Sequence, residues 1–196
     1  MSVRDYVKDL DESMPAAKNA RLGTTIQALI DAVNKMAAFF GTAGGGTGVL
    51  TSAGLVRGST DTRPANVAFN FFIAGLAYNK AAVAAGTAIG AQTVPANKWA
   101  LYRMSIQAGG TITNTPAAGN ATGYASEALA KAAIPATPAN EADMGYFTVL
   151  TMTDTQWIAA TDALAGGTSG NEASVTNYYN AALSLPIALT KLNDLP

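Results

Sequence analysis

The spacing of apolar residues changes at one short stretch of the chain, "GTAGGGTG" at residues 41–48. Upstream of this stretch, apolar residues recur every three or four positions, which is the period of an α-helix. Downstream, they alternate in short runs separated by glycine and proline, which is typical of β-strands joined by turns. We therefore expect two structurally different parts that meet at the glycines.

The upstream part contains a heptad seam. Its members are spaced four and three residues apart in alternation: Leu22, Ile26, Leu29, Val33, Met36 and Phe40. The flanking positions are small or apolar rather than charged, which favours three or more associating helices or a helix lying on a surface. An ordinary amphipathic helix packed on its own domain has the same spacing. We predict that residues 1–40 form a helical, coiled-coil-like stalk for self-association or anchoring, because the glycines that follow loosen it from the rest of the chain.

The glycines of residues 41–48 are Gly41, Gly44, Gly45, Gly46 and Gly48. A phosphate-binding P-loop ends in Lys-Ser or Lys-Thr, and a dinucleotide-binding loop follows a strand and opens a helix. This stretch has no lysine and follows a predicted helix. We predict a flexible hinge instead of a phosphate site.

Residues 49–180 are predicted to form a β-rich body. One strand is expected with four apolar residues on one face: Val67, Phe69, Phe71 and Ile73. A tight turn at Ala74-Gly75 leads to a return strand at residues 76–80. A further strand follows a turn at residues 95–98, with Ala100, Tyr102, Met104 and Ile106 on one face and Trp99, Leu101 and Arg103 on the other. The Gly-Gly pair in "QAGGTITNT" predicts a hairpin into the next strand.

The later part of the body is predicted to contain one short helix and two strands. Ser126 is a helix-capping residue type and should begin a helix that runs to about residue 133. A loop with two prolines is expected next, then a strand at "MGYFTVLTM" and another that ends at Tyr178-Tyr179. Short strands with Gly and Pro turns predict an antiparallel β-sandwich or barrel. Residues 181–196 are expected to be an apolar tail, either extended or a short helix broken at Pro186.

Composition excludes several kinds of chemistry. The chain has no cysteine and no histidine, so Ser-His-Asp and Cys-His nucleophilic sites and thiolate or imidazole zinc sites cannot form. Charged residues are only 13% and the net charge is −1, which argues against a nucleic-acid partner. The first residues are charged and no unbroken apolar run is long enough to span a membrane, so we expect synthesis in the cytoplasm and no membrane partner. We predict no cofactor.

Carboxylates are the remaining candidates for catalysis. Glu141 and Asp143 lie two residues apart in a predicted loop, and Asp154 and Asp162 flank Trp157. Paired carboxylates could hydrolyse glycosides at a suitable separation, but carboxylates in loops are usually only solvated. The acidic run at residues 9–12 lacks the glycine and spacing of a calcium loop. We therefore predict that the protein is not an enzyme.

Three weaker signals have competing explanations. Asn120 begins a glycosylation triplet, which is informative only for a secreted protein. The aromatic residues could form a sugar- or base-stacking platform, although core packing explains most of them. No acidic residue occurs between residues 62 and 126, where the charges are Arg63, Lys80, Lys98 and Arg103. This region could face an acidic protein partner, or its composition could be chance in a charge-poor chain.

The body resembles a group of small bacteriophage virion proteins, the capsid-decoration and head-fibre proteins. The resemblance spans residues 67–180 and rests on the order of several motifs: "VPANKWALYRMSIQAGGTITNTP", "SEALAKAAIPATPANEADMGYFTVLT", "DALAGG" and "VTNYYN". The start "RLGTTIQALIDAVNKM" also looks like the beginning of such proteins. The resemblance transfers no binding residues, because it carries no known set of contact positions.

The resemblance implies a non-enzymatic protein that assembles on a phage particle as a homotrimer. Its partners would be further copies of itself and the major capsid protein or neighbouring virion proteins. It would reside on the capsid surface, after assembly in the host cytoplasm. A tail-fibre or baseplate adaptor and a receptor- or glycan-binding module of the virion are the alternatives. Together with the residue patterns, this gives four expected segments: a stalk (1–40), a hinge (41–48), a body (49–180) and a tail (181–196).

Overall fold

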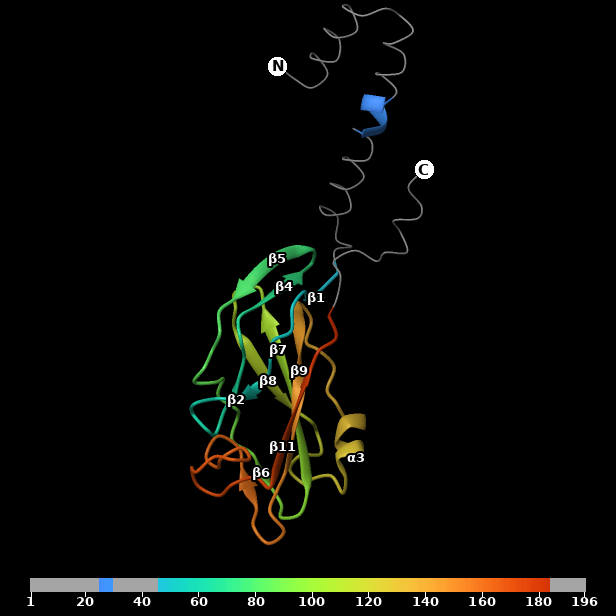
Figure 1. Cartoon of the computed structure of the whole chain (residues 1–196). Helices are drawn as coiled ribbons and strands as arrows, with labels where there is room; N and C mark the ends of the chain where they lie inside the picture. Colours follow the sequence, from blue (N-terminus) through green and yellow to red (C-terminus); the bar gives the residue numbers. More distant parts are fainter. Residues whose placement is uncertain (1–24, 30–45, 184–196) are drawn as a thin grey trace, which may run out of the picture. The chain divides into compact units, whose positions relative to one another are not determined.

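The computed structural model describes residues 25–29 and 46–183. The chain divides into two compact units, one formed by Met1–Gly44 with Leu189–Pro196 and the other by Gly45–Ala188. In the first unit, residues 25–29 are helical, and the rest of the predicted stalk lies outside the described residues. The second unit contains the strands of the described chain and is called the body below (Figure 1).

Four antiparallel strands form the larger sheet of the body. They are β7 (Trp99–Gln107), β8 (Ile112–Pro116), β9 (Glu141–Leu150) and β11 (Val175–Asn180), in the order β11-β9-β7-β8. β7 and β9 are the longest strands of the described chain and pair along their whole length. The prediction of a mainly β, antiparallel body is confirmed.

β7 shows the alternation predicted from its sequence. Ala100, Tyr102, Met104 and Ile106 are buried on one face and belong to the main core. On the other face, Leu101 is buried in a second, smaller cluster, and Trp99 packs against it. Successive side chains of a strand point to opposite faces, so β7 is buried on both sides.

A three-stranded sheet faces the larger one. Its order is β1-β4-β5, with β1 at Gly48–Val49, β4 at Phe69–Ile73 and β5 at Leu76–Lys80. The predicted turn joins β4 to β5: Ala74 and Gly75 have φ angles of 52° and 79°. Positive φ at both central residues is the type I′ geometry that matches the twist of a two-residue hairpin. β5 therefore begins and ends as predicted.

The predicted face of β4 needs one correction. Phe69, Phe71 and Ile73 share a face and are buried as expected, and Phe72 is buried on the opposite face. Val67 lies before β4 and is 48% exposed, because its amide donates to Ala53 O (2.9 Å) in an earlier segment instead of continuing the strand. The apolar alternation thus identified the strand but extended it by two residues.

The main core lies between the two sheets, which contact each other through β1, β4 and β9. Its largest fully buried side chains include Tyr102, Phe69, Phe71, Phe147 and Trp157. Tyr102 stacks on Phe147 with ring centroids 5.2 Å apart, and Trp157 meets the edge of Tyr102 at 6.2 Å. Burial of each large apolar side chain stabilises the fold by about 1.5–3 kcal/mol, so this cluster is the main source of stability.

Two short ribbons and one helix complete the body. β2 (Val56–Arg57) pairs with β3 (Pro64–Ala65), and β6 (Thr93–Val94) pairs with β10 (Trp157–Ile158), which carries Trp157 into the core. Helix α3 (Glu127–Ala132) covers the outer face of the larger sheet and buries Ala130 against Leu101. Ser126 caps α3 as predicted: the Leu129 amide donates to its hydroxyl at 3.3 Å.

Three strand boundaries in the second half differ from the sequence prediction. β9 begins at Glu141 rather than at Met144, so residues 141–143 belong to a strand and not to the proline-rich loop, and it ends at Leu150 rather than at Met152. β11 ends at Asn180, one residue beyond the predicted Tyr178-Tyr179. Of the predicted tail, residues 181–183 have no regular structure, and residues 184–196 lie outside the described residues.

A β-bulge interrupts the pairing of β7 with β9. Met104 is opposite Gly145, but the next residue, Ser105, is opposite Asp143, so Met144 is the extra residue. Gly145 has a φ of 121°, and a Cβ placed there would lie 2.0 Å from the backbone oxygen of Tyr179 on β11. Only glycine fits this position.

Replacing that glycine should destabilise the body strongly. We expect Gly145→Ala to lower the free energy of unfolding by about 3 kcal/mol or more, because the strained φ and the backbone clash add together. The matched control is Gly109→Ala, since no atom lies within 4 Å of a Cβ at Gly109. Urea unfolding followed by tryptophan fluorescence measures both variants. Equal stability of the two variants would contradict the steric account of the bulge.

Candidate functional site

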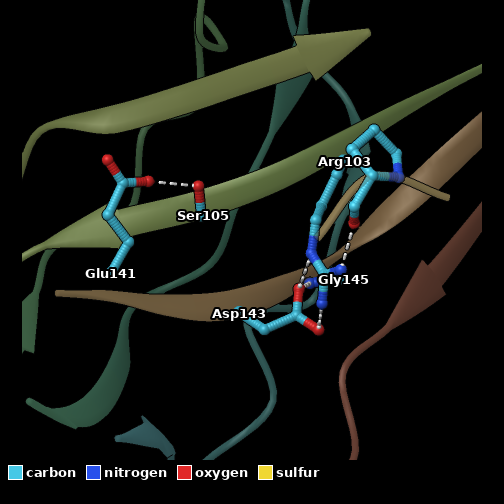
Figure 2. A network of polar contacts seen from close by, with 6 residues as sticks. Arg103, Ser105, Glu141, Asp143 and Gly145 are labelled. Carbon is cyan, nitrogen blue, oxygen red and sulfur yellow. Dashed lines mark hydrogen bonds and ion pairs between the residues drawn. The ribbon is translucent and has the colours of Figure 1, made fainter. Parts of the chain in front are cut away.

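Of the four acidic residues considered for catalysis, Glu141 and Asp143 lie on one face of β9 and not in a loop. Asp143 forms an ion pair with Arg103 of β7: Nε donates to one carboxylate oxygen at 3.2 Å and Nη2 to the other. Arg103 also donates from Nη1 to Pro135 O at 2.5 Å, which ties the loop before β9 to the sheet (Figure 2). The Gly145 amide donates to Asp143 at 3.0 Å. The Asp143 carboxylate is therefore occupied by groups of its own chain.

Glu141 is buried and fully hydrogen-bonded. It accepts from the Ser105 hydroxyl at one oxygen and from Gln107 Nε2 (2.9 Å) and the Thr113 hydroxyl (3.5 Å) at the other. Figure 2 shows that Glu141 with Ser105 and Asp143 with Arg103 form two separate contacts along the same pair of strands. Buried polar groups need such partners, and these bonds hold β7, β8 and β9 in register. This arrangement stabilises the sheet. Both oxygens of each carboxylate accept hydrogen bonds from the chain itself, so neither carboxylate has a free oxygen directed at the other.

Asp154, Asp162 and Trp157 do not form a site either. The Trp157 ring is fully buried, and its Nε1 donates to Ala163 O at 3.0 Å. Asp162 is buried and accepts from the amides of Ile158 (2.6 Å) and Asn171 (3.0 Å). Asp154 is exposed, and its contact is with the adjacent Thr155. Asp162 thus organises the loop after β10, and Asp154 is a solvated surface residue.

Asp61 is a structural acid that the sequence pattern did not reveal. It accepts from the amides of Thr168 (2.6 Å) and Ser169 (3.1 Å), more than a hundred residues later in the chain. Hydrogen bonds from Ser169 and Thr168 hold the pKa of Asp61 below its usual value. Like Asp162, it satisfies amides of the long irregular segment between β10 and β11. Nothing local marks Asp61, because its partners are brought to it only by the fold.

The densest polar cluster lies where α3 meets the sheet, and we call it the Glu127 cluster. One carboxylate oxygen of Glu127 accepts from the Thr148 hydroxyl (2.7 Å), the Tyr179 hydroxyl (2.8 Å) and Asn177 Nδ2 (2.9 Å). Lys131, one helical turn later, lies 3.4 Å from the same oxygen. The Lys131 ammonium also donates to the Tyr179 hydroxyl at 2.7 Å. The spacing of Glu127 and Lys131 was visible in the sequence, whereas their three sheet partners were not.

The Glu127 cluster favours the ionised carboxylate. Partial burial alone would raise the pKa of Glu127, but the hydrogen bonds from Thr148, Asn177 and Tyr179 and the charge of Lys131 outweigh it and lower the pKa to about 2. The pKa of Lys131 is raised by its hydrogen bond to Tyr179 and by Glu127. Both groups are therefore charged across the ordinary pH range and fasten α3 to the sheet.

The aromatic residues pack inward or against each other, as their core assignment predicted. The Tyr179 ring stacks on Tyr146 with centroids 4.8 Å apart, and the Lys131 ammonium lies 3.9 Å from the centre of the same ring. Tyr178 packs against the main core. The Tyr179 ring, which would otherwise be the best candidate for a stacking platform, is therefore already in contact with Tyr146 and Lys131.

The basic residues of the acid-free region are not gathered on one surface. Arg103 is paired with Asp143. Lys80 donates to Gly110 O at 2.8 Å, just after the end of β7, whereas Lys98 immediately precedes the start of β7. A nine-residue strand is roughly 30 Å long, so these lysines lie at opposite ends of it. The hypothesis of a single acid-binding surface in this region gains no support from the geometry.

Asn120 cannot act as a glycosylation acceptor in the folded body. It is fully buried, its Oδ1 accepts from the Leu101 amide (3.0 Å), and its Nδ2 donates to Leu101 O (2.8 Å). At this position of β7, the Asn120 side chain makes hydrogen bonds of the kind that a neighbouring strand would make.

Four residues of the predicted seam and hinge lie within the described chain. Ile26 is half-buried and Leu29 is 64% exposed. Gly46 is exposed, and its oxygen accepts from the Gly75 amide at 3.0 Å, while Gly48 is the first residue of β1. The remaining seam and hinge residues lie outside the described chain: Leu22, Val33, Met36, Phe40, Gly41, Gly44 and Gly45.

Within residues 25–29 and 46–183, no three acidic side chains gather as metal ligands would. No helix of this part of the chain is long and apolar enough to cross a membrane. Comparison with family models, with curated proteins and with solved structures finds no match for this chain.

The Glu127 cluster makes a specific contribution to stability that depends on pH. The folded-state pKa of Glu127, about 2, lies below the ordinary value of 4.5. Its stabilisation is therefore complete above about pH 5 and is lost as the pH falls towards 2. We expect Glu127→Gln to lower the free energy of unfolding by about 2 kcal/mol at pH 7, and by progressively less below pH 4.5.

The control for this prediction is Asp154→Asn, which removes an exposed carboxylate with no comparable partners. Urea unfolding of wild type and both variants from pH 3 to 7 gives the comparison. A stability difference for Glu127→Gln that does not change with pH would show that the charge of this residue is not what holds α3 to the sheet.

Proposed function

We propose that the protein is a non-enzymatic structural component of a bacteriophage particle, a homotrimeric capsid decoration or head-fibre protein. In this proposal a β-sandwich body is carried by an N-terminal helical stalk. The stalk associates through its apolar seam, and the body and stalk together bind the capsid shell. The resemblance of residues 67–180 to virion proteins suggests the particle, and the features below support a structural role.

The observation that carries the self-association is the exposure of Leu29. It belongs to the heptad seam, lies in the described helical residues 25–29 and is 64% exposed in the single chain. An isolated exposed leucine is ordinary, but this one recurs at seam spacing with five other apolar residues. Packing the seam against two further copies would bury it.

The internal use of the acidic side chains supports a non-catalytic role. Glu141, Asp143, Asp162 and Glu127 all accept hydrogen bonds or ion pairs from their own chain. General acid–base catalysis needs carboxyl groups that reach a substrate, often with pKa values near the working pH. Here the hydrogen bonds and the charge around Glu127 lower the pKa of this carboxyl group to about 2, away from that range.

The chain enters and leaves the body at one end, which suits a protein that is attached to a particle by that end. β1 begins and β11 ends at the same end of the body (Figure 1). The Ala181 amide, just after β11, donates to Met144 O at 3.1 Å, and β1 packs on the same strand, β9. Attachment at this end leaves the loops at the far end free. Contacts repeated by symmetry would let weak single interactions add up on a particle.

The experiment that tests the proposal is binding to phage particles that lack this protein. Purified protein is added and the complex is imaged by cryo-electron microscopy. Density at regular icosahedral positions is the expected outcome. Density confined to the tail or portal vertex would replace decoration by an adaptor role, and absence of binding would overturn the virion assignment.

The stalk assembly gives a second prediction. We expect Leu29→Asp to abolish the threefold association of the stalk, because three carboxylates in an apolar seam cannot be desolvated together. Ala28→Asp is the control, since residue 28 is exposed and lies off the seam. Sedimentation of wild type and both variants measures the mass. Equal masses for Leu29→Asp and Ala28→Asp would show that the seam does not hold the copies together.

A further inference from the structure

β5 is an edge strand whose outer side meets no backbone hydrogen-bonding partner within the described chain. On the larger sheet, side chains of the edge strand β11 bind loops: the Thr176 hydroxyl accepts from the Ala165 amide (3.0 Å) and the Asn180 side-chain oxygen from the Leu55 amide (2.9 Å). The β8 edge ends in Pro116, and Asn114 donates to Ala88 O (2.9 Å). β5 forms the outer border of the smaller sheet beyond β4 (Figure 1).

The hairpin geometry shows which β5 groups point outward. In a two-residue hairpin, the residues that flank the turn, Ile73 and Leu76, exchange hydrogen bonds, and alternate pairs beyond them do so too. Ala77 and Asn79 occupy the other pairs, so their N–H and C=O groups point away from β4. Asn70, which lies opposite Asn79, is consistent with this. Its backbone oxygen accepts from the Leu50 amide (2.8 Å) and its amide donates to the Thr51 hydroxyl (2.8 Å), so both groups point to the β1 side and not to β5.

Two usual protections of an edge strand, a proline and a β-bulge, are missing from β5. Its five residues contain no proline, and its pairing with β4 is regular. Its single charged residue, Lys80, is held by Gly110 O at 2.8 Å. Ala77 is exposed and too small to shield the backbone, and Leu76 is 60% exposed. No group of the described chain bonds to the outward N–H and C=O groups of Ala77 and Asn79.

We propose that β5 pairs with β5 of a second copy of this chain. The pairing is antiparallel about a twofold axis at Tyr78, with Ala77 opposite Asn79 of the other copy. The two smaller sheets then become one continuous six-stranded sheet, in the order β1-β4-β5 followed by its symmetry copy. Each of the two Ala77–Asn79 pairs exchanges both of its backbone hydrogen bonds.

The side chains of β5 suit this register. Lys80 comes opposite Leu76 of the other copy, so the two Lys80 ammonium groups are kept apart and no like charges face each other. The exposed Leu76 lies diagonally across from the other Tyr78, which already stacks on Phe71 at 5.4 Å. An extended strand of a different protein would meet the same backbone groups, but it need not have this self-complementary register.

This contact is distinct from the helix seam of the stalk. A twofold contact between bodies cannot close a threefold assembly, so it would join copies that belong to neighbouring trimers. It involves only described residues of the body, and it holds whether or not the protein decorates a capsid.

Disulfide trapping tests the register, because the chain has no cysteine of its own. Two full-length variants, Ala77→Cys and Asn79→Cys, are oxidised separately and as a mixture. Residues of a hydrogen-bonded antiparallel pair have Cα atoms about 5.5 Å apart, within reach of a disulfide, whereas two copies of residue 77 would be roughly 7–8 Å apart or more. We expect the mixture to form about ten times more of the 77–79 disulfide than either variant forms of its own dimer. No excess in the mixture would overturn the proposal.

A second pair of variants tests the backbone hydrogen bonds. Ala77→Pro removes the outward N–H without removing a bond of the β4–β5 hairpin, and Ala77→Val keeps the N–H. We expect Ala77→Pro to weaken the pairing of full-length protein about tenfold in sedimentation measurements, and Ala77→Val to leave it close to wild type. Equal association of the two variants would overturn the pairing through β5. The Leu29→Asp variant, which acts on the seam, should keep the β5 contact.

Discussion

The antiparallel pairing of β7 with β9 is the interaction on which the rest of the body depends. One face of this pair carries Tyr102 and Phe147, whose stacked rings lie at the centre of the main core. The other face carries Arg103, paired with Asp143, and further along it supports α3. Because side chains of a strand alternate between faces, a single strand pair can serve an apolar core and a polar outer layer at once. The smaller sheet, the helix and the loops are all added to this pair.

The polar groups of the body serve the fold in a consistent way. Three carboxylates accept hydrogen bonds from groups that no strand pairs: Asp61 and Asp162 accept from backbone amides of the segment before β11 and of its start, and Glu127 accepts from side chains of two strands. The chain has few carboxylates, and most of those in the described residues accept hydrogen bonds or form ion pairs within the chain. This use is the physical basis for proposing a structural and not a catalytic protein.

The proposed assembly contacts are of two different kinds. The seam of the stalk would bury apolar side chains such as Leu29 around a threefold axis, where the hydrophobic effect drives association. The β5 edge would join bodies mainly through backbone hydrogen bonds, which stabilise weakly but define the register. A particle surface offers both kinds of symmetry, and many weak contacts in a repeated lattice add to strong attachment.

The sequence alone predicted the local features of this protein. Alternation identified β7, the Ala74-Gly75 turn placed β4 and β5, and Ser126 marked the start of α3, because each depends on neighbouring residues. It failed where long-range contacts decide. Glu141 and Asp143 belong to β9 because they pair with Gln107 and Ser105 of β7, although the prolines before them predicted a loop. The order of the strands, the Glu127 cluster and the open edge of β5 depend on residues far apart in the chain. Only the tertiary structure brings these residues together, so no local pattern could have shown them.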